Sequence, residues 1–68
     1  MTREAVYDAL RSLGSTWWPL GQIAGRARFL TRADGDDRLV ARHLGRLVAE
    51  GRVERLTTEG YKAWRVAR

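Results

Sequence analysis

The stretch Asp36–Gly51, DDRLVARHLGRLVAEG, decides the fold because its two faces differ in character when it is read at helical period. An apolar stripe runs along one face and consists of Val40, Leu44, Leu47 and Val48. The far side carries three arginines at a spacing of four, Arg38, Arg42 and Arg46. Like charges at this spacing cost an isolated helix about 0.2–0.5 kcal/mol per pair, and no acidic residue lies between them. The pattern indicates either a solvated arginine face or a surface for a polyanionic partner.

Composition limits the chain to one small basic domain. With 68 residues, of which 44% are hydrophobic and 31% charged, it is typical of a globular protein, and residues 1–68 are predicted to form a single domain. The absence of cysteine excludes disulfides and thiolate metal sites, and the single histidine argues against a histidine-based metal site. We therefore expect no metal and no cofactor.

Net charge is +5 at pH 7, which favours nucleic acid or another acidic surface as the partner. The sequence has no run of about 18 apolar residues and no apolar signal-peptide core. We expect a cytoplasmic protein with no membrane partner.

Two helices are predicted before the central stretch. Residues 2–13 form the first, with Thr2 as its cap and Gly14 as its stop. Residues 15–19, STWWP, are a brief extended segment in which alternation turns one tryptophan ring inward and the other outward.

Residues 20–29 are predicted to form the short second helix, closed by Phe29 and Leu30. Gly21 and Gly25 weaken it by about 1 kcal/mol each relative to alanine. We expect close helix–helix approach, which small residues permit, to compensate for these glycines.

The rest of the chain gives a turn, the third helix and a hairpin. Residues 31–36 connect the second and third helices, and Asp36 is the expected N-cap of the third, which runs to Glu50. The period then changes to two, so that 52–56 and 61–66 are predicted strands joined by a four-residue connection over 57–60.

This order of elements resembles the winged helix-turn-helix family of DNA-binding domains, in the style of small bacterial or phage regulators of the MarR or ArsR type. The resemblance covers nearly the whole chain. It rests on Trp18-Pro19-Leu20-x-x-Ile23-Ala24, on Leu39–Arg55 and on Ala63-Trp64-Arg65-Val66. Within Leu39–Arg55 the family's spacing is kept by Val40, Leu44, Leu47, Gly51 and Val53. It implies an α+β fold of three helices followed by a two-stranded antiparallel wing, with a short extended segment before the second helix.

The resemblance further implies a transcriptional regulator that places helix 36–51 in the major groove of double-stranded DNA and hairpin 52–66 on the backbone or minor groove. Since the apolar stripe must face the core, the residues expected to point outward are Arg38, Ala41, Arg42, Gly45 and Arg46. We expect Arg38 and Arg42 near base edges and Arg46 on phosphate, with the small residues allowing close approach. Candidates for backbone contact are Arg55, Thr57, Thr58 and Lys62 on the wing and Arg26, Arg28 and Arg32 near the turn.

Other interpretations remain open. Asp36 and Asp37 stand at the helix end that should meet DNA, where their charge opposes phosphate. A winged-helix module that binds an acidic protein partner is the main alternative, and a binder of RNA or of DNA without sequence preference is another. A homodimer would use the first helix and the outward tryptophan. His43 is expected to be partly buried and structural, and no catalytic constellation or small-molecule site is visible, so we do not expect an enzyme.

Overall fold

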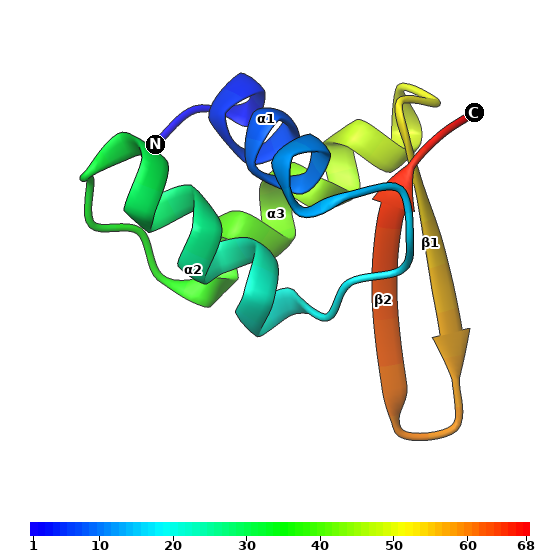
Figure 1. Ribbon diagram of the computed structural model, residues 1–68. Helices are drawn as coiled ribbons and strands as arrows, with labels where there is room; N and C mark the ends of the chain where they lie inside the picture. Colours follow the sequence, from blue (N-terminus) through cyan, green and yellow to red (C-terminus); the bar gives the residue numbers. More distant parts are fainter.

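Three helices pack around one core, and a two-stranded antiparallel hairpin projects from them (Figure 1). The computed structural model describes residues 1–68. The elements in chain order are α1 (Arg3–Leu13), α2 (Leu20–Thr31), α3 (Asp37–Ala49), β1 (Val53–Thr58) and β2 (Tyr61–Val66). This is the α+β, winged-helix-like arrangement predicted from the sequence.

The helix ends form where the sequence places their caps. The hydroxyl of Thr2 accepts the N–H of Ala5 at 3.1 Å, and the carboxylate of Asp36 accepts the N–H of Leu39 at 2.8 Å. At the end of α3, Gly51 has a φ of 77° and donates its N–H to the Val48 carbonyl at 3.0 Å. The next N–H also turns back to a carbonyl of α3, which completes a glycine-terminated helix end.

All three helices contribute to the core, which is closed by the hairpin. Its nine members are Val6, Leu10, Ile23, Ala24, Val40, Leu44, Leu47, Val53 and Trp64. The apolar stripe of α3 is therefore the buried one, as predicted, although Val48 is only half-buried at its edge. Burying this stripe fixes which side of α3 faces solvent.

The segment before α2 pairs with β2 of the hairpin through one isolated antiparallel bridge. The Trp18 N–H donates to the Trp64 carbonyl at 2.9 Å, and the Trp64 N–H donates back to the Trp18 carbonyl at 2.9 Å. The Trp18 side chain packs against the core, whereas the Trp17 ring lies under the Arg65 guanidinium, 4.3 Å from ring centroid to Cζ. Pairing of extended backbone is limited to the bridge at Trp18, since residues 15–16 form a bend, and both tryptophans are half-buried, in different surroundings.

Three local predictions are wrong. The hairpin connection is the two-residue turn Glu59–Gly60, because Thr58 already pairs with Tyr61. Helix α2 continues to Thr31, past the predicted end at residue 29. Gly21 and Gly25 are exposed, and a Cβ built on either would meet no atom within 4 Å, so no helix of this chain approaches them.

Helix α2 ends on a left-handed residue that is not glycine. Arg32 has a φ of 54° and donates its N–H to the Arg28 carbonyl. Gly35, in the same connection, has no positive φ. The connection between α2 and α3 therefore holds a backbone conformation that an L side chain disfavours.

Replacing Arg32 with glycine is expected to stabilise the fold by about 0.5–1 kcal/mol. Glycine removes the steric penalty of the left-handed conformation, and its greater conformational entropy in the unfolded chain offsets part of this gain. Arg32 is exposed and has no ion pair, so no contact is lost. Urea denaturation measures the gain in unfolding free energy, and the dependence of that free energy on urea concentration should not change. Arg32→Ala is the control and should give none, and an equal gain in both variants would contradict this explanation.

Candidate nucleic-acid interface

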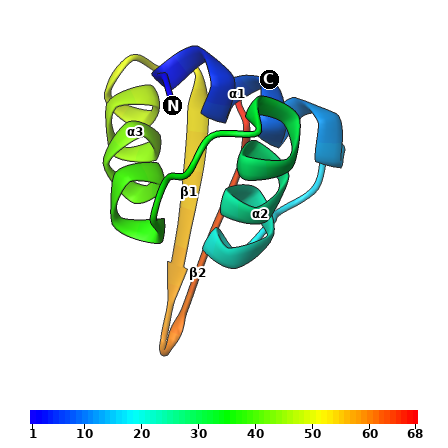
Figure 2. The same cartoon turned by 90° about the vertical axis from the view of Figure 1, so that its left-hand side faces the viewer.

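The outer face of α3 is a ladder of arginines without carboxylate partners. Arg38, Arg42 and Arg46 are all exposed, and none takes part in an ion pair. Gly45 is exposed between them and Ala41 is half-buried. In Figure 2, α3 lies at one edge of the molecule, with α2 on the other side of the hairpin. A long partner can therefore approach this helix from outside.

Most acidic side chains form ion pairs with basic residues outside the ladder of Arg38, Arg42 and Arg46. The ion pairs are Arg3–Glu50, Arg11–Asp8, Arg28–Asp37, Arg52–Glu4, Arg52–Glu50 and Arg65–Glu54. The bases without an ion pair are Arg26, Arg32, Arg38, Arg42, Arg46, Arg55, Lys62 and Arg68. The net charge of +5 is therefore carried by side chains that have no carboxylate within the molecule, and α3 and the hairpin hold most of them.

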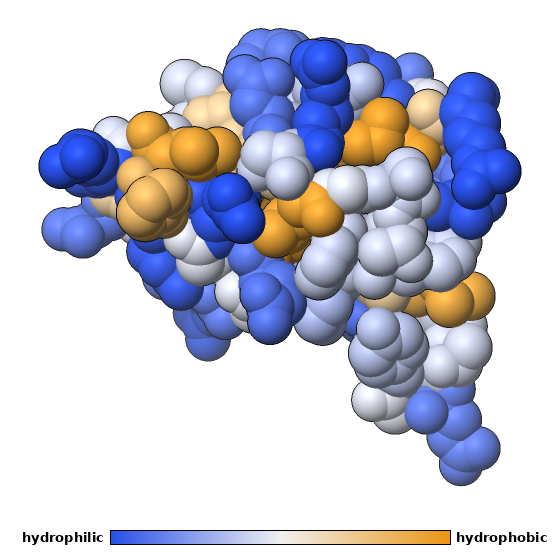
Figure 3. Space-filling model, viewed as in Figure 1, coloured by the Kyte–Doolittle hydropathy of each residue, from blue (hydrophilic) through white to orange (hydrophobic).

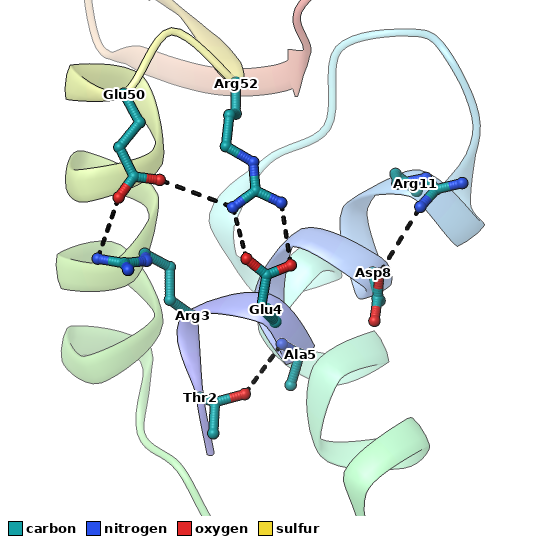
Figure 4. Close-up of polar contacts among 8 residues, drawn as sticks. All are labelled: Thr2, Arg3, Glu4, Ala5, Asp8, Arg11, Glu50 and Arg52. Atoms are coloured by element: carbon teal, nitrogen blue, oxygen red, sulfur yellow. Dashed lines mark hydrogen bonds and ion pairs between the residues drawn. The ribbon is translucent and has the colours of Figure 1, made fainter.

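A network of charges joins α1 to the junction between α3 and β1 (Figure 4). Arg52 contacts both carboxylate oxygens of Glu4, the second at 2.9 Å, and reaches Glu50 at 3.7 Å. Its guanidinium also lies over the Tyr7 ring, 4.2 Å from the centroid. Glu50 in turn pairs with Arg3 at 3.1 Å. These contacts link α1 to the junction from which the hairpin leaves α3.

The same network shifts the titration of its central pair. The hydrogen bond from Arg52 lowers the pKa of the Glu4 carboxyl from its ordinary value of 4.5, against a smaller opposing effect of desolvation. The same hydrogen bond raises the pKa of the Arg52 guanidinium. Both groups thus stay charged over the physiological range.

Replacing Glu4 with glutamine is expected to lower the melting temperature slightly at neutral pH and to have no effect in strong acid. Because the folded-state pKa of Glu4 is depressed, its contribution is complete above pH 4.5 and is lost as the pH falls through the folded value. Thermal melts across this range measure the difference between variant and unaltered chain. In an Arg52→Gln background the pH-dependent difference should disappear, and its persistence would show that another group causes it.

At the N-terminus of α3 the acidic caps have local partners. Asp36 accepts the Leu39 N–H, and Asp37 accepts a hydrogen bond from Arg28 Nη1 at 3.2 Å. The same Arg28 nitrogen donates to the Gly35 carbonyl at 2.9 Å. Arg28, a candidate for backbone contact, is thus half-buried and already engaged. Its charge offsets the charge of Asp37 at this helix end.

An open hollow of about 450 Å³ lies beside this end of α3. Its lining residues are Asp34, Gly35, Asp36, Arg38, Leu39 and Arg42. The two arginines expected near base edges therefore share one surface, which Asp34 and Asp36 also line.

Strand alternation sorts the hairpin candidates onto two faces. Arg55 is paired with Trp64, and Thr57 with Lys62, so Arg55, Thr57 and Lys62 lie on the face that carries core residue Trp64. These three side chains are exposed because the hairpin extends past the helices (Figure 1). Thr58 lies on the opposite face, with its pairing partner Tyr61. The structure thus groups three of the four wing candidates.

The role of Arg52 escaped sequence reasoning. It lies 48 residues from Glu4, and no local pattern links the two. His43 is half-buried, as predicted, and its Nε2 has no hydrogen-bond partner. No group of three or more histidine, cysteine or acidic side chains is arranged to hold a metal ion.

Comparison with protein-family models, with curated proteins and with solved structures found no match for this chain. The longest helix, α3, has 13 residues, and none of the helices combines the length and apolarity that crossing a membrane requires.

Proposed function

We propose that this protein binds double-stranded DNA, with α3 in the major groove and the hairpin on the backbone or minor groove. The observation that carries the proposal is the exposed ladder of Arg38, Arg42 and Arg46, which has no carboxylate partner in the molecule. A DNA phosphate chain supplies the missing charge, and guanine edges match the arginine fork.

Dimensions support the same proposal. An α-helix with side chains is about 10–12 Å across and the major groove is about 12 Å wide. Successive arginines of the ladder are four residues apart, which is about 6 Å along the helix. Exposed Gly45 leaves open space between the arginines, so that the helix can approach closely. The wing adds Arg55 and Lys62, both unpaired and on one face.

The acidic end of α3 does not oppose this docking strongly. Asp37 is balanced by Arg28, and the carboxylate of Asp36 is directed to the Leu39 N–H. Asp34 has no ion pair, but Arg38 and Arg42 line the same hollow. A role as a transcriptional regulator rests on the resemblance to winged helix-turn-helix proteins and is part of the proposal.

A salt titration with random-sequence duplex tests the proposal. We expect log K to fall linearly with log salt, with a slope of about −0.9 for each phosphate contacted. Single-stranded RNA of the same length is the comparison, and duplex DNA should bind more tightly. No duplex binding at low salt would refute the proposal, and a preference for RNA would favour the alternative reading as an RNA binder.

A further inference from the structure

A second surface lies between the end of α1 and the outer side of α2. It is an open groove of about 410 Å³ lined by Leu13, Gly21, Gln22, Gly25, Arg26 and Phe29. No residue of α3 or of the hairpin lines it. The groove is therefore distinct from the arginine ladder.

Of the two apolar residues that line this groove, Leu13 packs partly against the core, whereas Phe29 does not. Phe29 is 74% exposed, the largest value among the big hydrophobic residues, and the neighbouring Leu30 is 48% exposed. Isolated apolar side chains on a surface are ordinary, but Phe29 shares its hollow with Leu13 from another helix. Gly21 and Gly25 leave open space beside them. Figure 3 shows apolar surface on the side of the molecule where α2 lies.

The polar part of the groove is cationic. Arg26 has no ion pair, and α2 contains no acidic residue. On α1, Asp8 is paired with Arg11. The groove thus offers an apolar hollow with an unpaired guanidinium on its wall.

Charge excludes a second copy of this chain as the favoured occupant. Two-fold packing of α2 against α2 would bring two Arg26 side chains together with no acid from either helix to separate them. A helix of 12 residues is about 18 Å long, too short to bury the roughly 800 Å² per partner of a standard interface. An acidic segment does not meet the charge obstacle, and a weak or transient complex needs less buried area than a standard interface.

We infer that this groove binds an acidic amphipathic segment of another protein. An apolar side chain of that segment lies between Leu13 and Phe29, and a carboxylate next to it pairs with Arg26. This is the helix-in-groove mode of recognition, with an apolar anchor for affinity and one charge pair for register. Because α3 and the hairpin do not line the groove, the ladder and the wing stay free for DNA. Arg26, named above as a candidate for backbone contact, is assigned to the groove instead.

Selection from a displayed library of random 16-residue peptides tests the inference. We expect enriched peptides to combine a large apolar residue with a neighbouring Asp or Glu. The best enriched sequence is then synthesised with a fluorophore and titrated by anisotropy. Phe29→Ser and Arg26→Glu should each weaken its binding about tenfold or more, which is about 1.4 kcal/mol.

Two matched controls accompany these variants. Leu30→Ser removes an exposed apolar residue outside the groove, and Arg68→Glu makes the same charge change far along the chain. Both should change the affinity less than about twofold. Gly25→Gln fills the groove at a helical position with open space around it, so it should fold and still block the peptide.

Four outcomes of the peptide experiments would overturn the inference. They are a selection that enriches nothing, a consensus without acidic residues, a loss of affinity equal in controls and groove variants, and full binding by the Gly25→Gln variant. Self-association in sedimentation that Phe29→Ser abolishes would also overturn it, since the occupant would then be a second copy. Duplex DNA binding by the Phe29→Ser variant should be unchanged, which separates this site from the proposed DNA surface.

Discussion

Replacing Arg42 with alanine is expected to weaken binding to the preferred DNA site by about 1–3 kcal/mol and to relax the preference for one base. Arg42 is in the middle of the ladder and lines the hollow at the start of α3. The measurement is a titration of the variant against the best sequence selected from a random duplex pool and against its single-base variants. An equal loss on every sequence would assign Arg42 to a phosphate instead.

The Arg42→Ala variant should be slightly more stable to unfolding than the unaltered chain, although it binds DNA more weakly. Arg42 is exposed and unpaired, and it lies four residues from both Arg38 and Arg46, so its removal relieves two repulsions of about 0.2–0.5 kcal/mol each. Alanine is also the best helix former. We expect a small rise in the denaturation midpoint with weaker DNA binding. Arg68→Ala removes the same charge outside the ladder and is the control for net charge.

Replacing Leu44 with alanine is expected to destabilise the fold by about 2–5 kcal/mol, because Leu44 is fully buried and its truncation leaves a cavity. A domain of this size has a total stability of only several kcal/mol, at about 0.05–0.15 kcal/mol per residue. We expect the melting temperature to fall by at least about 10 °C. Circular dichroism melts measure it.

Leu30→Ala is the matched control, since Leu30 is 48% exposed on α2 and outside the core cluster. It should change stability by less than about 0.5 kcal/mol. If Leu44→Ala proved as mild as this control, Leu44 would not be part of the core and the orientation of α3 would be wrong. The arginine ladder would then no longer be fixed toward solvent.

Short-range patterns predicted most of the fold correctly. Thr2, Asp36 and Gly51 act at helix ends through bonds to residues at most five positions away, so their roles are readable locally. The errors have a different origin. The four-residue hairpin connection was wrong because Thr57 and Thr58 pair with β2, and such register depends on the partner strand.

Gly21 and Gly25 show a second limit of sequence reasoning. Small residues on a helix favour close approach, but the sequence does not say whether the approaching element belongs to the same chain. In the fold they border an open groove. For the candidate DNA surface, the outward direction of Arg38 and Arg42 followed from the apolar stripe opposite them. The sorting of Thr57 and Thr58 onto different faces required the register.

The salt dependence of duplex binding for the unaltered chain and for the Arg38→Ala/Arg42→Ala/Arg46→Ala triple variant tests the central claim most directly. All three residues are exposed and unpaired, so the variant should remain folded. If the ladder meets DNA, each arginine that neutralises a phosphate contributes about 0.9 to the slope of log K against log salt. We expect a weaker affinity and a slope shallower by about 1–3. An unchanged affinity and slope would contradict the placement of α3 in the groove.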